Sequence, residues 1–468
     1  MLLDVATLRR SKFRDPRFMG PMRVQTRVAP LQNVRCSEGF FAVKQPHYAF
    51  QSEIRNSLWH SDKGPLCSAR HIDKPMKETE TSSSGGVAGV SATEMTTQLV
   101  GDSEQSPMDR TPKIAGMGRG QLTDNFRSIL EVNAIYYPVA YRFDRRIGEG
   151  QQGVVYQAQR QGSRGCITKH AVKIFNPGVY STVKKYWTDM GRIAAQVSRL
   201  QSSRSPQLVD CDIYEETNGI GYIQMELVDG MNLREFLNSQ HLDIAQTQSS
   251  PREWSQFMKV LFNFHDNTLC IQPGVAVYIM RQILSGLESL HSARYLHCDV
   301  KPLNTMIDPL GYVKIIDFGR ANFINERTTF LLGTPAYMAP EVHDRKQTSI
   351  QSDLYSVGLV GLELLRGKPV VELNRINEAE LIRAKYDLPE RLPALVPPYV
   401  RRNDQLMGIL SRLLHPDPAR RFPDARTAET TSEGLGLVHR QLTRLDIDSD
   451  YRRDLATYLN RLGYPKSK

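Results

Sequence analysis

The sequence has few cysteines, and none of them lie close together. The six cysteines of this 468-residue chain are scattered, and no two form a C-x-x-C pair. A disulfide framework and a zinc site both depend on closely spaced cysteines, so this scatter argues against both. We therefore expect a protein of a reducing compartment.

Long apolar runs are missing as well. No stretch approaches the roughly 20 apolar residues needed to span a bilayer. The first ten residues, MLLDVATLRR, lack the apolar segment of a secretory signal peptide. Hydrophobic residues still make up 40% of the chain and charged residues 24%, which is enough for a sizeable core. We expect a soluble, cytoplasmic protein with no membrane span.

The net charge of +10 is unevenly distributed. Residues 1–75 hold 13 Lys and Arg against 6 Asp and Glu. This composition indicates a basic, mobile arm, with contact to an acidic surface and a targeting signal as the alternatives. Residues 76–135 are rich in Ser, Thr and Gly, and we expect a disordered linker there because too little apolar surface offsets the entropy of ordering.

From residue 139 the pattern changes to that of a folded domain. Within 139–228, GVVYQAQR and GYIQMELV alternate as strands do, and within 229–435 a series of amphipathic helices begins with VAVYIMRQILSGLESLHS. A strand-rich half before a helix-rich half predicts two lobes with a cleft between them. Residues 436–468 are typical of a helical tail. No aromatic–basic module accompanies its basic groups, so we expect no nucleic-acid partner.

Residues 238–272 lengthen the connection before the first long apolar helix. Their segment PREWSQFMKVLFNF brings several large apolar side chains together. We expect this segment to pack on the helix-rich lobe, and a docking surface for a partner helix is the alternative.

The stretch IGEGQQGVVY contains a G-x-G-x-x-G pattern at Gly148, Gly150 and Gly153. A dinucleotide site would open a helix at this point, whereas VVYQAQR continues as a strand. The pattern therefore favours a hairpin whose backbone N–H groups approach phosphates, with an ordinary tight hairpin as the alternative. Lys173 in the next strand, HAVKIF, would then lie in the cleft and neutralise phosphate charge.

Three polar residues follow an apolar helix in YLHCDVKPLN, namely Asp299, Lys301 and Asn304. Each alone is compatible with loop capping. Together with GEGQQGVV, AVK, IIDFG, GTPAYMAPE, SDLYSVG and DPARR, which follow the same order, the stretch resembles the eukaryotic-type protein kinases of the serine/threonine class. The resemblance covers about residues 139–435 and implies an α+β, bilobal kinase fold, with ATP, Mg²⁺ and a protein substrate.

The resemblance also implies roles for single residues. Asp299 would accept the proton of the substrate hydroxyl, and Asn304 and Asp317 would hold Mg²⁺. The implied catalytic residues are Lys173, Asp299, Lys301, Asn304 and Thr334. The implied nucleotide site consists of Ile147, Gly148, Glu149, Gly150, Gly153, Val155, Ala171, Lys173, Met225, Glu226, Val228, Asn232, Met306 and Asp317.

The resemblance also implies individual contacts with the nucleotide and within the protein. The backbone near Glu226 and Val228 would bond the edge of the adenine base, and Asn232 stands where a ribose contact is expected. Glu341 resembles a residue that pairs with an arginine, here Arg421, as a structural brace.

Cys298 departs from the kinase pattern. Most family members have an arginine between the histidine and the aspartate, and that arginine meets a phosphorylated activation loop. Cys298 removes this cationic pocket but leaves Asp299 in register. We therefore expect activity that does not strictly need phosphorylation of Thr328 or Thr329.

A second departure concerns the partner of Lys173. In the family this lysine pairs with a glutamate on the next helix, here VKKYWTDMGRIAAQVSRL. The family spacing leads to Ile193, and Asp189 is the one carboxylate in this stretch. We expect Asp189 to replace the glutamate, with an ordinary surface role for Asp189 as the alternative.

Two functions follow as hypotheses. The first is an active serine/threonine protein kinase, favoured by the intact set of polar groups. The second is a pseudokinase or nucleotide-binding scaffold that regulates a partner protein, favoured by the missing glutamate. The layout of a long polar extension before a compact kinase is similar to that of kinases which bacteria inject into host cells. It is equally compatible with an ordinary intracellular kinase, and the sequence carries no sign of an oligomeric state.

Overall fold

The computed structural model describes residues 117–466 apart from 202–203, 327–332, 372–376, 431 and 446–449. The basic arm expected over 1–75 and the expected linker up to residue 116 lie outside the described residues, and so do Thr328 and Thr329. No helix within the described part of the chain is both long and apolar enough to cross a membrane.

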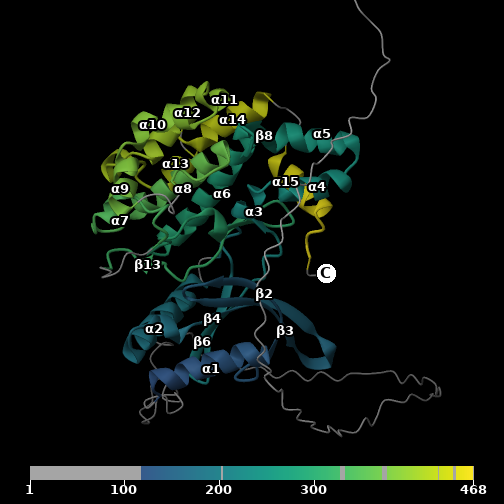
Figure 1. Cartoon of the computed structure of the whole chain (residues 1–468), viewed down its shortest axis with the longest axis vertical. Coiled ribbons are helices and arrows are strands. Elements are labelled where there is room, and N and C mark those ends of the chain that lie inside the picture. The colour runs from purple at the N-terminus through teal and green to yellow at the C-terminus, as the bar shows by residue number, and fades with distance from the viewer. Residues whose placement is uncertain are drawn as a thin grey trace, which may run out of the picture. The chain divides into compact units, whose positions relative to one another are not determined.

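The first lobe is a curled antiparallel sheet with two helices (Figure 1). The strand order is β1-β2-β3-β4-β6-β5. Its strands are β1 (Ala134–Ile135), β2 (Tyr141–Gly150), β3 (Gly153–Gln161), β4 (Ile167–Phe175), β5 (Cys211–Thr217) and β6 (Ile220–Met225). Its helices are α1 (Arg119–Val132) and α2 (Val183–Leu200), with short 3₁₀ turns at η2 (Ser163–Gly165) and η3 (Pro177–Val179). β6 is buried along its whole length, including Gln224, because it lies between β4 and β5 inside the sheet.

The shape of the β2–β3 hairpin depends on Gly153. This residue has φ = +155°, and a Cβ atom placed on it would lie 1.9 Å from the carbonyl oxygen of Ile174 in β4. Since only glycine accepts this conformation so close to a neighbouring backbone, it lets the hairpin lie against β4.

Helix α1 corrects the linker expected over 76–135. It begins at Arg119 and buries Leu122, Phe126 and Ile129. These three residues recur at steps of four and three, so they form one face of the helix. The side chain of Asn125 also donates a hydrogen bond to the carbonyl of Asn218 in the β5–β6 turn, 2.8 Å away. The sequence prediction missed this helix because its short amphipathic pattern follows a long stretch of low apolar content.

The second lobe is built around two buried helices, α6 (Pro273–Ser292) and α8 (Ile350–Arg366). Every residue of α8 from Ser352 to Leu365 is buried, so this helix is surrounded by the lobe. The other helices are α3 (Leu233–Phe236), α4 (Gln240–Thr247), α5 (Pro251–Val260), α7 (Pro340–His343), α9 (Glu378–Tyr386), α10 (Leu388–Leu395), α11 (Pro398–Arg401), α12 (Asp404–Leu413), α13 (Ala425–Thr430), α14 (Leu435–Leu445) and α15 (Tyr451–Arg461), with 3₁₀ turns η4 (Pro302–Asn304) and η6 (Pro418–Arg420).

Short strands lie on the side of this lobe that faces the first. They are β7 (Met231–Asn232), β10 (Tyr295–Leu296), β11 (Thr305–Ile307), β12 (Val313–Ile315) and β13 (Asn322–Phe323), while β8 (Phe262–His265) and β9 (Thr268–Ile271) form a separate hairpin. The loop of YLHCDVKPLN runs between β10 and β11, so the sheet pairings fix both of its ends.

The segment 238–272 packs on the helix-rich lobe, as expected. Phe257, Leu261 and Phe262 are at most 2% exposed. The ring of Tyr458 in α15 lies edge-on to Phe257, with centroids 5.1 Å apart. The tail expected over 436–468 consists of α14 and α15, and α15 closes on α4 and α5.

Candidate active site

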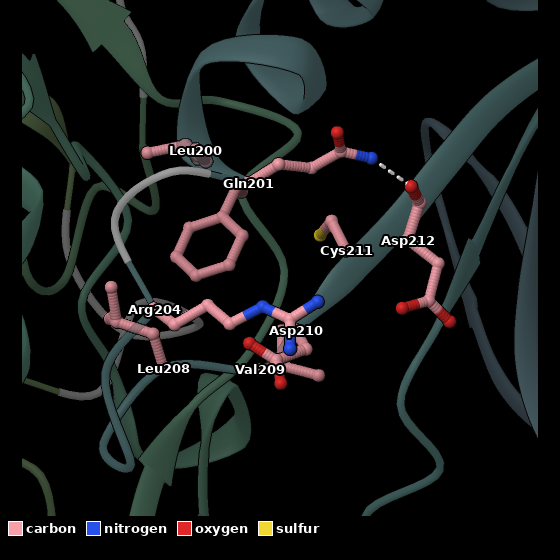
Figure 2. A pocket seen from close by; sticks show the side chains of 9 residues that line it. Leu200, Gln201, Arg204, Leu208, Val209, Asp210, Cys211 and Asp212 are labelled. Carbon is pink, nitrogen blue, oxygen red and sulfur yellow. Dashed lines mark hydrogen bonds between the residues drawn. The ribbon is translucent and has the colours of Figure 1, made fainter. Parts of the chain in front are cut away.

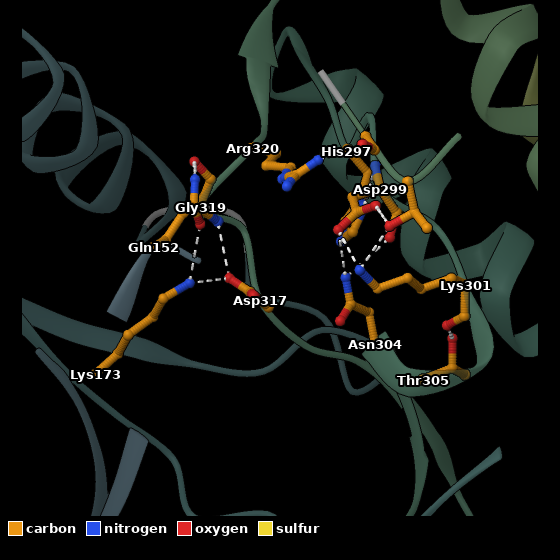
Figure 3. Close-up of polar contacts among 12 residues, drawn as sticks. Gln152, Lys173, His297, Asp299, Lys301, Asn304, Thr305, Asp317, Gly319 and Arg320 are labelled. Carbon is orange, nitrogen blue, oxygen red and sulfur yellow. Dashed lines mark hydrogen bonds and ion pairs between the residues drawn. The ribbon is translucent and has the colours of Figure 1, made fainter. Parts of the chain in front are cut away.

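Three predicted residues donate to the carboxylate of a fourth, Asp299 (Figure 3). Asp299 is 6% exposed. Lys301 Nζ donates to its Oδ2 at 2.8 Å, and Thr334 Oγ1 donates to its Oδ1 at 2.7 Å. Asn304 Nδ2 donates to the same Oδ2 at 3.1 Å, and Lys301 Nζ also reaches Thr334 Oγ1 at 2.8 Å. The carboxylate is therefore held in one orientation by three donors from two segments.

Asp353 of α8 anchors the loop that carries Asp299. The carboxylate of Asp353 accepts from the backbone N–H groups of His297 and Cys298 at 2.8 and 2.9 Å, and from His291 Nε2 at 2.9 Å. Burial acts to raise the pKa of Asp353, but the bonds from the histidines and backbone outweigh it and hold that pKa below its usual value. The anchor stays ionised at neutral pH.

Cys298 takes part in this anchor through its backbone alone. It has φ = +62°, in the left-handed region. That conformation is strained for a residue with a side chain, and the bond to Asp353 stabilises it. The bond that ties position 298 to the anchor therefore comes from its backbone and not from the thiol.

A second polar group comes from the first lobe. Lys173 lies on β4 with its side chain 7% exposed, and its ammonium forms a close ion pair with Oδ1 of Asp317. Burial acts to raise the pKa of Asp317, but Lys173 outweighs it and holds the pKa at about 2. Asp317, at φ = +65°, also accepts from the N–H of Gly319 at 3.1 Å. Its carboxylate is thus ionised throughout the physiological pH range.

Both groups open into one cavity of about 600 Å³ between the lobes. This volume lies within the range of sites for small molecules. Among the predicted residues, its lining includes Ile147, Gly148, Glu149, Gly150, Gly153, Val155, Ala171, Lys173, Met225, Glu226, Val228, Asn232, Asp299, Lys301, Asn304, Met306 and Asp317. Thr334 is not part of the lining and contacts the cavity only through Asp299 and Lys301.

The side-chain oxygen of Asn232, expected to reach a ribose, has another role in the structure. It accepts from the N–H of Glu235 at 2.9 Å and so caps α3. Glu235 itself lines the cavity and brings a carboxylate to the same place. No sequence pattern singles out Glu235, because an acidic residue in a first helical turn is common.

The residues expected to hold Mg²⁺ fit that ion by their chemistry. Asn304 and Asp317 line the same cavity and present an amide oxygen and a carboxylate. Mg²⁺ prefers oxygen ligands and is usually bound by one or two carboxylates together with phosphate oxygens and water. The amide nitrogen of Asn304 donates to Asp299, which directs that nitrogen away from a metal.

Comparison with known proteins agrees with this geometry. Residues 141–430 match the protein kinase domain model. This chain belongs to the protein kinase family.

Curated relatives of this kinase include bacterial serine/threonine kinases. It is 32% identical to the probable serine/threonine-protein kinase pknA2 of Bifidobacterium longum over 49% of this chain and 26% of that protein. It is 28% identical to the serine/threonine-protein kinase pkn3 of Myxococcus xanthus over 65% of this chain and 51% of that protein. For PknD of Mycobacterium tuberculosis the figures are 28%, 63% and 40%. The chain thus spans between about a quarter and a half of these relatives.

The expectation that Asp189 pairs with Lys173 is wrong for this kinase. Asp189 accepts from Tyr180 Oη at 2.5 Å and from Arg192 Nε at 2.8 Å. It is therefore engaged with other residues, about one to two helical turns before the part of α2 that lies beside Lys173. A separate small cavity also lies beside Lys173. The residues of α2 that line it include Ile193 and Gln196, neither of which carries a charge.

Helix α2 is instead tied to the backbone after Asp317. Arg192 donates to the carbonyls of Ala321 and Gly319 at 2.5 and 3.0 Å, and Gln196 Nε2 donates to the carbonyl of Phe318 at 2.9 Å. These bonds need no phosphorylated residue. The kinase thus has fixed contacts between α2 and the start of its activation segment.

Sequence reasoning missed two residues of the cavity lining that come from the tail. Tyr464 and Lys466 line the same cavity as the glycine-rich hairpin. The ammonium of Lys466 lies 4.4 Å from the centre of the Tyr464 ring. Figure 1 shows the segment after α15 descending from the helical lobe toward the strands. Only the tertiary structure reveals this contact, since the two segments are about 300 residues apart.

A smaller cavity lies beside the C-terminal end of α2, and none of the predicted site residues line it (Figure 2). Its volume is about 60 Å³, and it is lined by Leu200, Gln201, Arg204, Leu208, Val209, Asp210, Cys211, Asp212 and Phe318. Burial raises the pKa of the Cys211 thiol to about 12, so this cysteine is no nucleophile at neutral pH.

Proposed function

We propose that this protein is a serine/threonine protein kinase that transfers the γ-phosphoryl group of ATP to serine or threonine hydroxyls of a protein. In this proposal Asp299 orients the acceptor hydroxyl and takes its proton. Lys301 stands beside the transferred phosphoryl group, and Thr334 links Asp299 to the segment where a peptide would bind.

The observation that carries the proposal is the arrangement around Asp299. Its carboxylate is fixed by Lys301, Thr334 and Asn304 at the wall of the same cavity that holds the Lys173–Asp317 pair. Phosphoryl transfer requires positioning and charge neutralisation more than covalent chemistry. A base and a cation at one cavity meet that requirement.

The remaining roles follow from position. Lys173 would bind the α- and β-phosphates, and the apolar walls at Val155, Ala171 and Met306 would enclose the adenine. Asn304 and Asp317 would hold Mg²⁺, which supplies charge neutralisation to the phosphate oxygens when it is bound. Glu235 offers a carboxylate to the ribose hydroxyls.

A pseudokinase is the second candidate. The observation in its favour is that α2 supplies no carboxylate to Lys173 among the described residues. A lysine held less firmly would bind the phosphates less well, and the domain would then act as a nucleotide-binding scaffold.

An assay with Mg²⁺ and labelled ATP separates the two candidates. Wild type is compared with Lys173→Met and Asp299→Ala, using phosphoamino-acid analysis of the labelled protein. We expect label on serine or threonine in wild type and none in either variant. Incorporation by wild type no greater than by the variants would leave only the scaffold, and label on tyrosine would contradict the assigned class.

Replacement of Thr328 and Thr329 together by alanine should leave turnover within about threefold of wild type. The reason is that Cys298 offers no cation to a phosphate, while Arg192 already bonds the activation segment through backbone carbonyls. Steady-state rates of both proteins, each treated first with a phosphatase, measure this. A collapse of the double variant's rate would refute it.

Replacement of Tyr464 by alanine should weaken nucleotide binding by about 1 kcal/mol, a several-fold rise in the dissociation constant. The ring is 8% exposed and lines the cavity, and it carries the ammonium of Lys466. Calorimetry with a non-hydrolysable ATP analogue measures the effect. Arg453→Ala, on an exposed position of the same tail, is the control, and equal affinities for all three proteins would remove the tail from the site.

A further inference from the structure

Gln152 lies at the turn between β2 and β3 and reaches two groups of the site (Figure 3). Its Oε1 accepts from Lys173 Nζ at 3.3 Å, and its Nε2 donates to the carbonyl of Gly319 at 3.1 Å. One amide side chain thus connects the glycine-rich hairpin, the lysine of β4 and the backbone after Asp317.

A second amide, on α2, lines a small cavity together with the same lysine. Gln196 is 2% exposed and lines, together with Lys173, a small cavity of about 20 Å³. Its Nε2 donates to the carbonyl of Phe318, whereas its Oε1 is buried and has no hydrogen-bond partner in the part of the chain that the structure describes. A buried acceptor without a donor is destabilising, and Lys173 is a donor that lines the same cavity.

The need for these acceptors arises when a nucleotide binds. Lys173 is almost fully buried, and in the structure its charged partner is Asp317. On the function proposed above, Asp317 would turn its carboxylate to a metal ion, which weakens its hold on the lysine. The acceptors then available to Lys173 include Oε1 of Gln152, which it already reaches, and Oε1 of Gln196, which belongs to the lining of the same small cavity.

We propose that Gln152, from the β2–β3 turn, and Gln196, from α2, form a neutral amide clamp that positions Lys173 toward the phosphates. Both are positioning residues. The bonds of the clamp are charge-assisted because the lysine is ionised, but an amide brings no opposite charge, so the clamp holds the lysine less tightly than a carboxylate would. It also leaves the full positive charge of Lys173 to the nucleotide. This inference rests on the proposed function for the identity of the ligand.

The test measures the dissociation constant of a non-hydrolysable ATP analogue with Mg²⁺, alongside kcat and KM for ATP. We expect Gln152→Ala and Gln196→Leu each to raise the dissociation constant and to lower kcat/KM by about tenfold, the usual effect of losing one hydrogen bond to a charged group. Gln161→Ala, at an exposed end of β3, and Ser198→Ala, on an exposed position of α2, are the matched controls and should behave as wild type.

Rescue distinguishes the clamp from a general loss of structure. Adding Gln196→Glu to the Gln152→Ala variant supplies a carboxylate on α2, which should return the dissociation constant to within about threefold of wild type. Wild-type affinity in both single variants, or no gain from the added carboxylate, would overturn the clamp.

The measurement of nucleotide binding distinguishes failure of the clamp from failure of the proposed function. A wild type that binds the analogue but transfers no phosphoryl group would refute the proposed function, and the affinities of the variants would still decide the clamp. A wild type that transfers phosphoryl groups, with variants equal to it in both measurements, would refute the clamp alone. Failure of the wild type to bind the analogue at all would overturn both.

Discussion

Replacing Asp299 by asparagine should lower kcat by about 10³-fold, since a positioned general base contributes roughly 10²–10⁴-fold. Asparagine has nearly the same shape but accepts no proton. Its amide would also replace one of the two carboxylate oxygens, which now accept bonds from Lys301, Thr334 and Asn304, by an NH2 donor. The other oxygen still accepts, so the loop should keep its fold while the side chain is held less firmly.

The KM for ATP should change little, because Asp299 faces the acceptor hydroxyl in the proposed mechanism. Initial rates over a range of ATP concentrations give both constants. Asp243→Asn, on an exposed position of α4, is the control for loss of a carboxylate elsewhere. A turnover close to wild type would show that Asp299 is not the base. Loss of nucleotide binding along with turnover would show that the loop has collapsed instead.

Much of the site was predictable because its chemistry is local in the sequence. The loop of Asp299, Lys301 and Asn304 is only six residues long, so spacing alone brings these side chains together. Asp317 follows a buried strand and is held by Lys173, and both come from short strand-and-turn patterns. The prediction of two lobes likewise rested on a change from strand to helix periodicity, and the structure confirms it.

What escaped prediction depends on contacts between distant segments. Asp353 anchors the catalytic loop, but its sequence neighbours only show that it belongs to an apolar helix. Helix α1 was missed because Leu122, Phe126 and Ile129 are few and follow a polar stretch. In each case the side chain gains its role from what packs against it, which the local pattern does not record.

The partner of Lys173 shows a different limit. The partner expected on α2 was a carboxylate, so the prediction named Asp189 and left out Gln196. The structure places Asp189 with Tyr180 and Arg192. An amide accepts a hydrogen bond from an ammonium as a carboxylate does, so on the clamp proposed above the expected helix was right and the expected residue type was wrong.

Replacing Arg421 by methionine should lower the free energy of unfolding by about 3–5 kcal/mol, the usual cost of breaking a buried ion pair by removing one partner. Arg421 is paired with Glu341 through two bonds of 2.8 Å, and the side chains are 0% and 6% exposed. The pairing of these two residues was expected from the sequence, and the structure confirms it. Methionine fills part of the space but leaves the carboxylate buried without its cation.

The guanidinium also holds three backbone carbonyls, so the loss extends beyond the ion pair. Arg421 donates to the carbonyls of His415, Gln351 and Pro416 at 2.6, 2.9 and 3.0 Å. Urea unfolding of wild type and variant measures the difference, and Arg420→Met, on the exposed neighbour, is the matched control. Adding Glu341→Gln to Arg421→Met should recover part of the loss, because the unpaired charge is then gone. A double variant less stable than Arg421→Met alone would show instead that Glu341 stabilises the lobe through Ser352, whose hydroxyl donates to it at 2.8 Å, rather than through the arginine.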